Sequence, residues 1–289
     1  MQKLAKDIYI ETGFAGVTVG AIVTSEGVIC IDAPTHPADA RRWKLKLSQI
    51  SPKPILFTIN LDHHRDRILG NQWLEAPVIA HEVTSERVRQ LPETFKGGLS
   101  EIGADADLAT EVVGVRFVPP HITFSNQMTL VRGLTEINLI HHPGPTAGAI
   151  WVEVPEAQVV FMGDAVTNDI PPMLQEAQLD HWLEALALVQ KKKFLAQVVV
   201  PGRGALTDKA GVKVMEDFLK AARRKIETML RAKRTRTEVA QIVEPMLDYF
   251  TVPNTMRDHF TRRMRTGLEH LYDAMLIAQN QQRQQSPFL

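Results

Sequence analysis

ILFTINLDHHRDRILGN, residues Ile55–Asn71, is the stretch of sequence that decides the fold. Its first six residues form a continuous apolar run, which favours a buried β-strand. The ten residues Asp62–Asn71 come shortly after and contain two aspartates, two histidines and two arginines. Because these polar residues follow a buried strand, we expect them at its carboxyl end, where they form the main candidate for a functional site.

Short β-rich runs separated by turns make up most of the first two hundred residues. Two hairpins are predicted, one over Val17–Asp32 and one over Ala149–Asp164. A strand meander is predicted over Val115–His142, and residues 93–112 give no firm prediction. The remaining predictions are helices at Pro37–Ile50, near Val83–Gln90 and at Leu179–Lys191, and strands at Pro77–His81 and Ala196–Gly204.

The C-terminal part of the chain has a different pattern. From Asp208 to about Gln282 there is no strand signal, and apolar residues recur at helical spacing. Thr235 and Glu238 match a capping box that would begin a second helix. We therefore divide the chain at residue 206, into a domain of residues 1–206 and a helical extension of residues 207–289.

The composition of the 289 residues excludes several classes of protein. A hydrophobic content of 44% indicates a globular chain, and a single cysteine, Cys30, excludes an internal disulfide framework. Lys+Arg 33 balances Asp+Glu 33, so the net charge gives no general attraction to nucleic acid or to anionic membranes. No apolar run reaches the ~18 residues that span a bilayer. The N-terminus lacks the apolar core of a signal peptide, so a cytoplasmic protein is expected.

The stretch Asp62–Asn71 resembles the HxHxDHxxGN signature of the metallo-β-lactamase superfamily, and Gly70-Asn71 fixes the register. The resemblance implies an α+β fold, a four-layer αββα sandwich over about residues 8–206, to which the helical extension is added. Four further landmarks resemble that family in type and order: the early strand Gly27–Asp32, PGPTAG at Pro143–Gly148, VVFMGDAV at Val159–Val166 and VVVPGRG at Val198–Gly204.

The family's site, as the resemblance implies it, holds two metal ions with five histidines and two aspartates. In this sequence His64, Asp66 and Asp164 keep the expected residue type. Asp62 stands where the first histidine belongs and offers an oxygen ligand. Asp62, His64 and Asp164 are therefore the predicted ligands of one divalent ion, either Mn, Fe, Zn or Mg, or else no metal is bound.

Three other ligand positions of the family carry residues that cannot bind a metal. Pro145, Arg67 and Arg203 stand where the resemblance places histidines, and none of these side chains has a lone pair to give. Both arginines fall on the second metal position. A dinuclear zinc site is therefore not expected, and we hypothesise that the two guanidinium groups neutralise the carboxylates in place of the second ion.

Three functional hypotheses remain open at this point. The first is a divergent hydrolase of an ester, thioester, lactone or phosphoester, in which one metal ion lowers the pKa of a bound water. In that case Asp66 would act as general base, and Arg67 or Arg203 would stabilise the oxyanion. The second is a metal-free pseudoenzyme or a module that binds a small anionic ligand. The third is a structural subunit of a homo-oligomer formed through the helical extension.

The other polar residues of these segments have simpler interpretations. His63, His141 and His142 are expected to be solvated or hydrogen-bonded in place, and Cys30 is expected in the core. Asp169 follows the Asp164 strand and is a secondary site candidate. A basic run between Lys220 and Arg236 is interpreted as a solvated helix face, so nucleic acid is not an expected partner.

Overall fold

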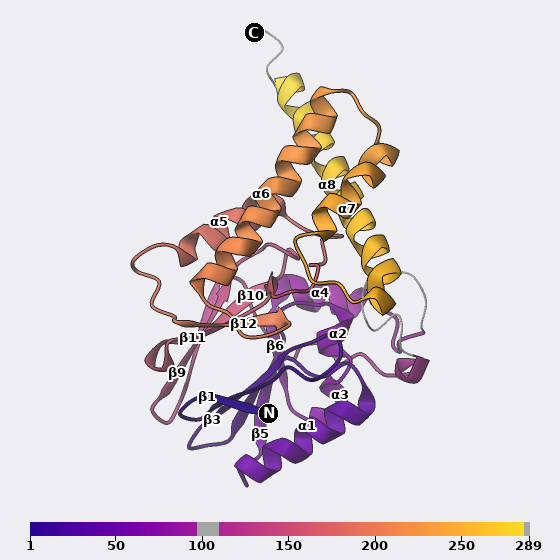
Figure 1. The fold of residues 1–289 in the computed structure, drawn as a ribbon. Helices are drawn as coiled ribbons and strands as arrows, with labels where there is room; N and C mark the ends of the chain where they lie inside the picture. The colour runs from indigo at the N-terminus through magenta and orange to yellow at the C-terminus, as the bar shows by residue number, and fades with distance from the viewer. Residues whose placement is uncertain (97–109, 286–289) are drawn as a thin grey trace.

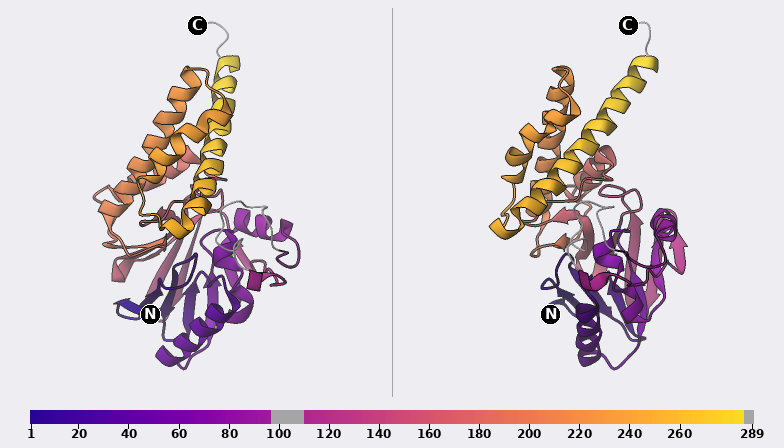
Figure 2. Two further views of the ribbon diagram at one scale, coloured as in Figure 1. Left: turned by 45° about the vertical axis from the view of Figure 1, so that its right-hand side comes forward. Right: turned by 90° about the vertical axis from the view of Figure 1, so that its right-hand side faces the viewer.

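The protein is described by a computed structural model that covers residues 1–96 and 110–285. Two β-sheets lie face to face, and helices cover the outer face of each sheet (Figure 1). The predicted αββα sandwich is therefore confirmed. The helical extension rises from one side of the sandwich, as Figure 2 shows from two directions.

The first sheet has seven strands, which follow one another in sequence order across the sheet. Neighbouring strands are antiparallel from the first to the fourth and parallel from the fourth to the seventh. The strands are β1 (Gln2–Ala5), β2 (Ile8–Glu11), β3 (Val19–Val23), β4 (Val28–Ile31), β5 (Ile55–Ile59), β6 (Val78–His81) and β7 (Ile122–Phe124).

The second sheet has five strands in the order β12-β11-β10-β9-β8. The pair β11 and β12 is parallel, and the other neighbours are antiparallel. Apolar residues of both sheets meet between them in one cluster, to which Ile29, Ile59, Ile150 and Phe161 belong. The strands are β8 (Gln127–Arg132), β9 (Thr135–His141), β10 (Ile150–Val154), β11 (Val159–Thr167) and β12 (Val198–Arg203).

The expected meander over Val115–His142 is wrong in two respects. Residues 115–120 form no strand beyond an isolated bridge between Arg116 and Thr94. The strand that follows, β7, pairs with β6 in the first sheet, whereas β8 and β9 form a hairpin in the second sheet. The chain thus crosses from one sheet to the other directly after β7. The apolar alternation of short strands predicts that they pair, but it does not say with which neighbour.

Helices on the first sheet are packed through a few large side chains. The helix α1 (Pro37–Ile50) has the predicted bounds and buries Trp43 and Leu47 against the sheet. Three shorter helices follow the strands β5 and β6: α2 (Arg65–Ile68), α3 (Asn71–Leu74) and α4 (Glu82–Gln90).

The second sheet is covered by α5 (Leu179–Val189) and by the extension. The extension contains α6 (Lys209–Arg231), α7 (Ala240–Leu247) and α8 (Arg257–Gln285). Thr235 and Glu238 form the predicted capping box, ahead of α7. Trp182 of α5 and Phe218 of α6 belong to one apolar cluster, which also contains residues of β10 and β11. The extension therefore shares its core with the sandwich, and the division at residue 206 stays a prediction.

Candidate functional site

The candidate site lies where the carboxyl ends of four strands from both sheets meet. Asp32 directly follows β4, and Asp62 follows β5. Asp164 lies within β11, and Arg203 is the last residue of β12. Two further side chains, those of Asp66 and Arg67, come from the single turn of α2 that follows β5. The sandwich therefore brings the predicted site residues together and adds Asp32, which was not predicted, to them.

Close backbone packing fixes the turn that carries Asp66 and Arg67. A Cβ atom on Gly70 would lie 2.1 Å from the carbonyl oxygen of Pro34, so only glycine fits there. The next residue, Asn71, donates from its side-chain amide to Asn60 Oδ1 at 2.7 Å. The Gly-Asn pair that sets the register of the motif thus also anchors it to the end of β5.

Arg67 occupies the centre of the site. Its Nη1 atom lies 2.6 Å from Asp32 Oδ2 and its Nε atom lies 2.8 Å from Asp62 Oδ1. Its Nη2 atom forms an ion pair with Asp164. The Arg67 side chain has no exposed surface, so one buried guanidinium faces three buried carboxyl groups. Arg67 therefore contacts two of the predicted metal ligands and is not confined to the second metal position.

Arg203 and His64 complete the network. Arg203 Nη2 lies 2.8 Å from Asp66 Oδ2, and Arg203 Nε lies 3.2 Å from Asp164 Oδ1. His64 Nδ1 lies 2.8 Å from Asp164 Oδ2 and 3.3 Å from Asp62 Oδ2. A Cβ on Gly202 would lie 2.4 Å from Asp164 Oδ1, so the glycine before Arg203 makes room for this carboxylate.

The pKa values of the buried groups follow from these contacts. Burial alone would raise the pKa of Asp62, but Arg67 and His64 lower it to about 2. Arg203, Arg67 and His64 likewise hold the pKa of Asp164 well below its usual range, against the effect of burial. Burial alone would lower the pKa of His64, yet Asp62 and Asp164 raise it to about 10. His64 is therefore an imidazolium at neutral pH and donates to Asp164.

Asp32 behaves differently from the other carboxyl groups. Burial raises its pKa to about 7, and the attraction of Arg67 offsets only part of this effect. His64 thus adds a third basic group to Arg67 and Arg203, and these face four carboxyl groups, of which Asp32 has a pKa raised to about 7. The sequence predicted Asp62, Asp66 and Asp164 for this site but not Asp32.

A metal ion fits the spacing of the site but not its charge. Asp62, His64 and Asp164 each offer a ligand atom, and these atoms lie within 4.8 Å of one another. However, His64 Nδ1 is already in contact with Asp164 Oδ2 at 2.8 Å and with Asp62 Oδ2 at 3.3 Å. The guanidinium of Arg67 also lies against Asp62 and Asp164, where it would repel a cation. As arranged, the residues do not accommodate a metal ion.

The catalytic roles predicted for Asp66, Arg67 and Arg203 stay predictions. Asp66 and Arg67 are fully buried and Arg203 is 2% exposed, and all three are held in ion pairs. A general base or an oxyanion donor has to reach the substrate. This arrangement therefore favours a neutralising role for Asp66 and Arg67 over a catalytic one, whereas Arg203 also lines a pocket.

Residues with simpler interpretations lie as expected. His63 Nε2 is 2.9 Å from Glu176 Oε2, and the His63 ring lies beside that of His64, with 5.8 Å between their centroids. The His141 ring stacks on His81, and the His142 ring packs against Trp151. Cys30 is fully buried, and burial raises the pKa of its thiol to about 12.

A pocket of about 370 Å³ opens beside Arg203, and we call it the mouth pocket. Residues from six parts of the chain meet in it, and two of these residues, Met256 and Phe260, belong to the extension. Asp169 is exposed and does not line it, although the next residue, Ile170, does. The lining consists of Thr12, Phe14, Ala15, Gly16, Val17, His36, Glu111, Ile170, Arg203, Gly204, Met256 and Phe260.

Sequence reasoning missed Asp32 and most of this pocket. The signal for Asp32 was present, because an aspartate ends the apolar run Gly27–Ile31 just as Asp62 follows the run Ile55–Asn60. Met256 and Phe260 lie in the C-terminal part of the chain, for which the sequence predicts only helices with apolar residues at helical spacing. Their place at the pocket depends on how α8 packs against the sandwich, which a helical pattern does not encode.

Comparison with known proteins agrees with this geometry. The family model of the metallo-β-lactamase superfamily matches residues 12–203, and the chain belongs to that superfamily. The matched stretch ends at Arg203, so it includes every residue of the network.

Three solved structures share the fold at low sequence identity. A metallo-β-lactamase from Pontibacter korlensis is 19% identical with a TM-score of 0.60, over 76% of this chain and 97% of its own. The DIM-1 metallo-β-lactamase is 20% identical with a TM-score of 0.60, over 76% and 96%. A metallo-β-lactamase from Hirschia baltica is 14% identical with a TM-score of 0.55, over 75% and 96%. Among the described residues, no helix has the length and apolar character needed to cross a membrane.

Proposed function

We propose that this chain is a metal-free member of the metallo-β-lactamase superfamily that binds a small anionic molecule in the mouth pocket. The observation that carries the proposal is the position of Arg67, whose guanidinium faces Asp32, Asp62 and Asp164 at once. In this proposal Arg67 and Arg203 supply the positive charge that metal ions supply elsewhere in the family. Superfamily membership suggests hydrolase-like chemistry at this edge of the fold. In this proposal the same edge binds a small anionic molecule and does not hydrolyse it.

The network supports binding because it holds the floor of the pocket in place. Arg67 and Arg203 join the ends of β4, β5, β11 and β12 through buried ion pairs. Removing one partner of such a pair leaves an uncompensated buried charge, which is strongly unfavourable. The site is therefore rigid, and a pre-formed site binds its ligand with less loss of conformational entropy.

The lining of the mouth pocket indicates the kind of ligand. Phe14, Met256 and Phe260 supply apolar surface. Arg203 supplies a basic group, and His36 Nδ1 lies 3.1 Å from the one acidic group of the lining, Glu111. The pocket volume of about 370 Å³ falls in the range of small-molecule sites. A molecule with an apolar body and one anionic end fits this lining.

The proposal can be tested with octanoate as the probe and octanol as its neutral control, using isothermal titration calorimetry. We expect octanoate to bind at one site per chain, and octanol to bind at least about ten-fold more weakly because it lacks the charge. Met256→Glu places a negative charge in the pocket and should weaken octanoate binding. Asn254→Glu adds the same charge at an exposed position outside the pocket and should not. Equal binding of both probes, or equal effects of both variants, would contradict the proposal.

One observation favours a second candidate, the hydrolase with a single metal ion. Asp62, His64 and Asp164 lie close enough together to bind the same ion. This function requires His64 to lose its proton and Arg67 to withdraw from two carboxylates. It predicts about one equivalent of Mn, Fe, Zn or Mg in protein purified without chelator, together with hydrolysis of an ester, thioester, lactone or phosphoester that depends on that metal. The metal-free proposal predicts neither.

A further inference from the structure

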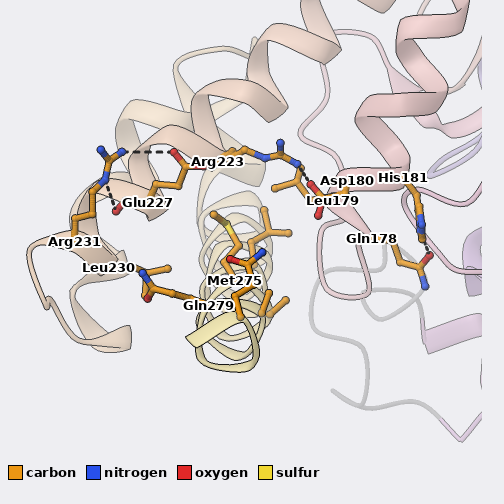
Figure 3. A pocket seen from close by; sticks show the side chains of 14 residues that line it. Gln178, Leu179, Asp180, His181, Arg223, Glu227, Leu230, Arg231, Met275 and Gln279 are labelled. Carbon is orange, nitrogen blue, oxygen red and sulfur yellow. Dashed lines mark hydrogen bonds and ion pairs between the residues drawn. The ribbon is translucent and has the colours of Figure 1, made fainter. Parts of the chain in front are cut away.

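A second concave surface lies in the helical extension, away from the charged network. It is a groove of about 810 Å³ between the start of α5, the second half of α6 and the last turns of α8. Figure 3 shows Leu179, Leu230 and Met275 around it. These side chains, with Leu271, give the groove an apolar floor, and we call it the extension groove.

The charged residues of the extension groove neutralise one another. Arg223 of α6 forms an ion pair with Asp180 of α5, and Arg231 lies 3.6 Å from Glu227 within α6 (Figure 3). A charged occupant would have to compete with these pairs. The rim therefore suits a segment that is apolar at its centre and uncharged along its length.

The last turns of α8 have this composition. Residues 274–282, AMLIAQNQQ, contain no charged side chain in a chain that is 23% charged. Ile277 in this segment is 57% exposed, and Ala274 and Ala278 are exposed as well. Burial of this exposed isoleucine and the small residues beside it against a partner would be favourable, because apolar surface is removed from water and no charge has to be desolvated.

Independently of the proposed function, we propose that the extension groove binds a second copy of this chain, through residues 274–282 of its α8. The same segment of α8 both lines one wall of the groove and presents Ile277 beside it. When one surface contains both the groove and the segment that fills it, two copies of the chain can bind each other in the same way. Such self-complementarity is the requirement for a two-fold symmetric dimer. The lining residues of α8 run from Leu271 to Gln282, which is about 16 Å of helix at 1.5 Å per residue. Three turns of a partner helix therefore fit along it.

Light scattering on the full chain over a concentration series tests this inference. We expect the mass of two chains at high concentration and dissociation on dilution. Ala278→Glu places a charge inside the groove at an exposed position, so folding should be unaffected. The dimer dissociation constant should rise at least about ten-fold, because each interface would bury an unpaired carboxylate. Ala240→Glu makes the same substitution at an exposed position of α7, outside both the groove and the segment 274–282, and is the matched control.

Each possible result of these measurements either supports or contradicts the inference. A dimer that is weakened by Ala278→Glu and unchanged by Ala240→Glu supports the inference. A monomer at every concentration overturns it, and so does a dimer that both variants leave intact or that both weaken equally. Circular dichroism of the two variants checks that they are folded.

Discussion

The Nη1 atom of Arg67 lies 2.6 Å from the Oδ2 atom of Asp32, and neither side chain has any exposed surface. This contact joins the ends of two neighbouring parallel strands, because Asp32 ends the segment of β4 and Arg67 lies in the turn after β5. The same guanidinium also faces Asp62 and Asp164. Arg67 is thus the cation on which the charge balance of the site depends.

Replacing Arg67 by an apolar residue of similar size should strongly destabilise the fold. Arg67→Met leaves three carboxyl groups without their shared cation, and we expect the free energy of unfolding to fall by about 3–5 kcal/mol. Arg265→Met is the control, because Arg265 is about half exposed and pairs with Glu269 on the same helix. Its loss should lie within ~0.5 kcal/mol. Urea denaturation of both variants measures the difference, and similar losses would contradict this role of Arg67.

Replacing Arg67 by lysine distinguishes the contribution of its positive charge to stability from the contribution of the guanidinium geometry. Arg67→Lys keeps the positive charge, but an ammonium group cannot face three carboxyl groups as a planar guanidinium does. We therefore expect a loss of stability between those of the wild type and Arg67→Met. If charge alone mattered, urea denaturation would show that Arg67→Lys is as stable as the wild-type protein.

The protonation state of His64 can be read directly by NMR. Asp62 and Asp164 raise the pKa of His64 to about 10, so its ring should carry a proton on both nitrogens at pH 8. The stability that this proton contributes should be complete below pH 6.5 and be lost as the pH rises through 10. The ¹⁵N shifts of the labelled ring measure this state, and His64→Gln provides the assignment. A neutral ring at pH 8 would show that the balance of charge described here is wrong.

His142 should make the fold less stable in mild acid. Burial, together with the neighbouring His141, lowers the pKa of His142 from 6.5 to about 4. Between these values the unfolded chain takes up a proton that the folded chain does not. Stability from this group is therefore complete above pH 6.5 and falls by up to about 3 kcal/mol as the pH drops to 4. His142→Asn should flatten this part of the pH profile of the unfolding free energy, whereas His181→Asn at an exposed position should leave it unchanged.

The helical extension should be needed for the sandwich to fold. Trp182 and Leu186 of α5 share one apolar cluster with Phe218 and Leu219 of α6. A chain that ends at residue 206 exposes this face, and we expect it to aggregate or to lose its near-ultraviolet circular dichroism. A chain that ends at residue 285 is the control. A soluble chain of residues 1–206 with a native spectrum would instead support two independent domains.

Most of the fold could be predicted from the sequence, because the patterns that indicate strands and helices are local. An apolar run that ends in Asp62–Asn71 predicts a strand and a site, and the bounds of the helix Pro37–Ile50 follow from its pattern. Pairing between distant segments is not local. The placement of β7 in the first sheet and the packing of α8 beside the mouth pocket therefore emerged only from the structure.

The candidate site was predictable in its residues but not in its contacts. The motif positions of Asp62, His64, Asp164, Arg67 and Arg203 placed these side chains at one edge, where they are found. Which carboxylates a long arginine reaches depends on its rotamer and on its neighbours. The sequence therefore could not show that Arg67 faces the predicted metal ligands, nor that Asp32 joins them.

A crystal structure of protein purified without chelator and supplied with Mn²⁺ and Zn²⁺ tests the replacement of metal by arginine most directly. Anomalous scattering would locate any ion between Asp62, His64 and Asp164. We predict no anomalous peak at that position, with the guanidinium of Arg67 in contact with Asp32, Asp62 and Asp164. An ordered ion bonded to the three ligands, with Arg67 turned away from them, would contradict it.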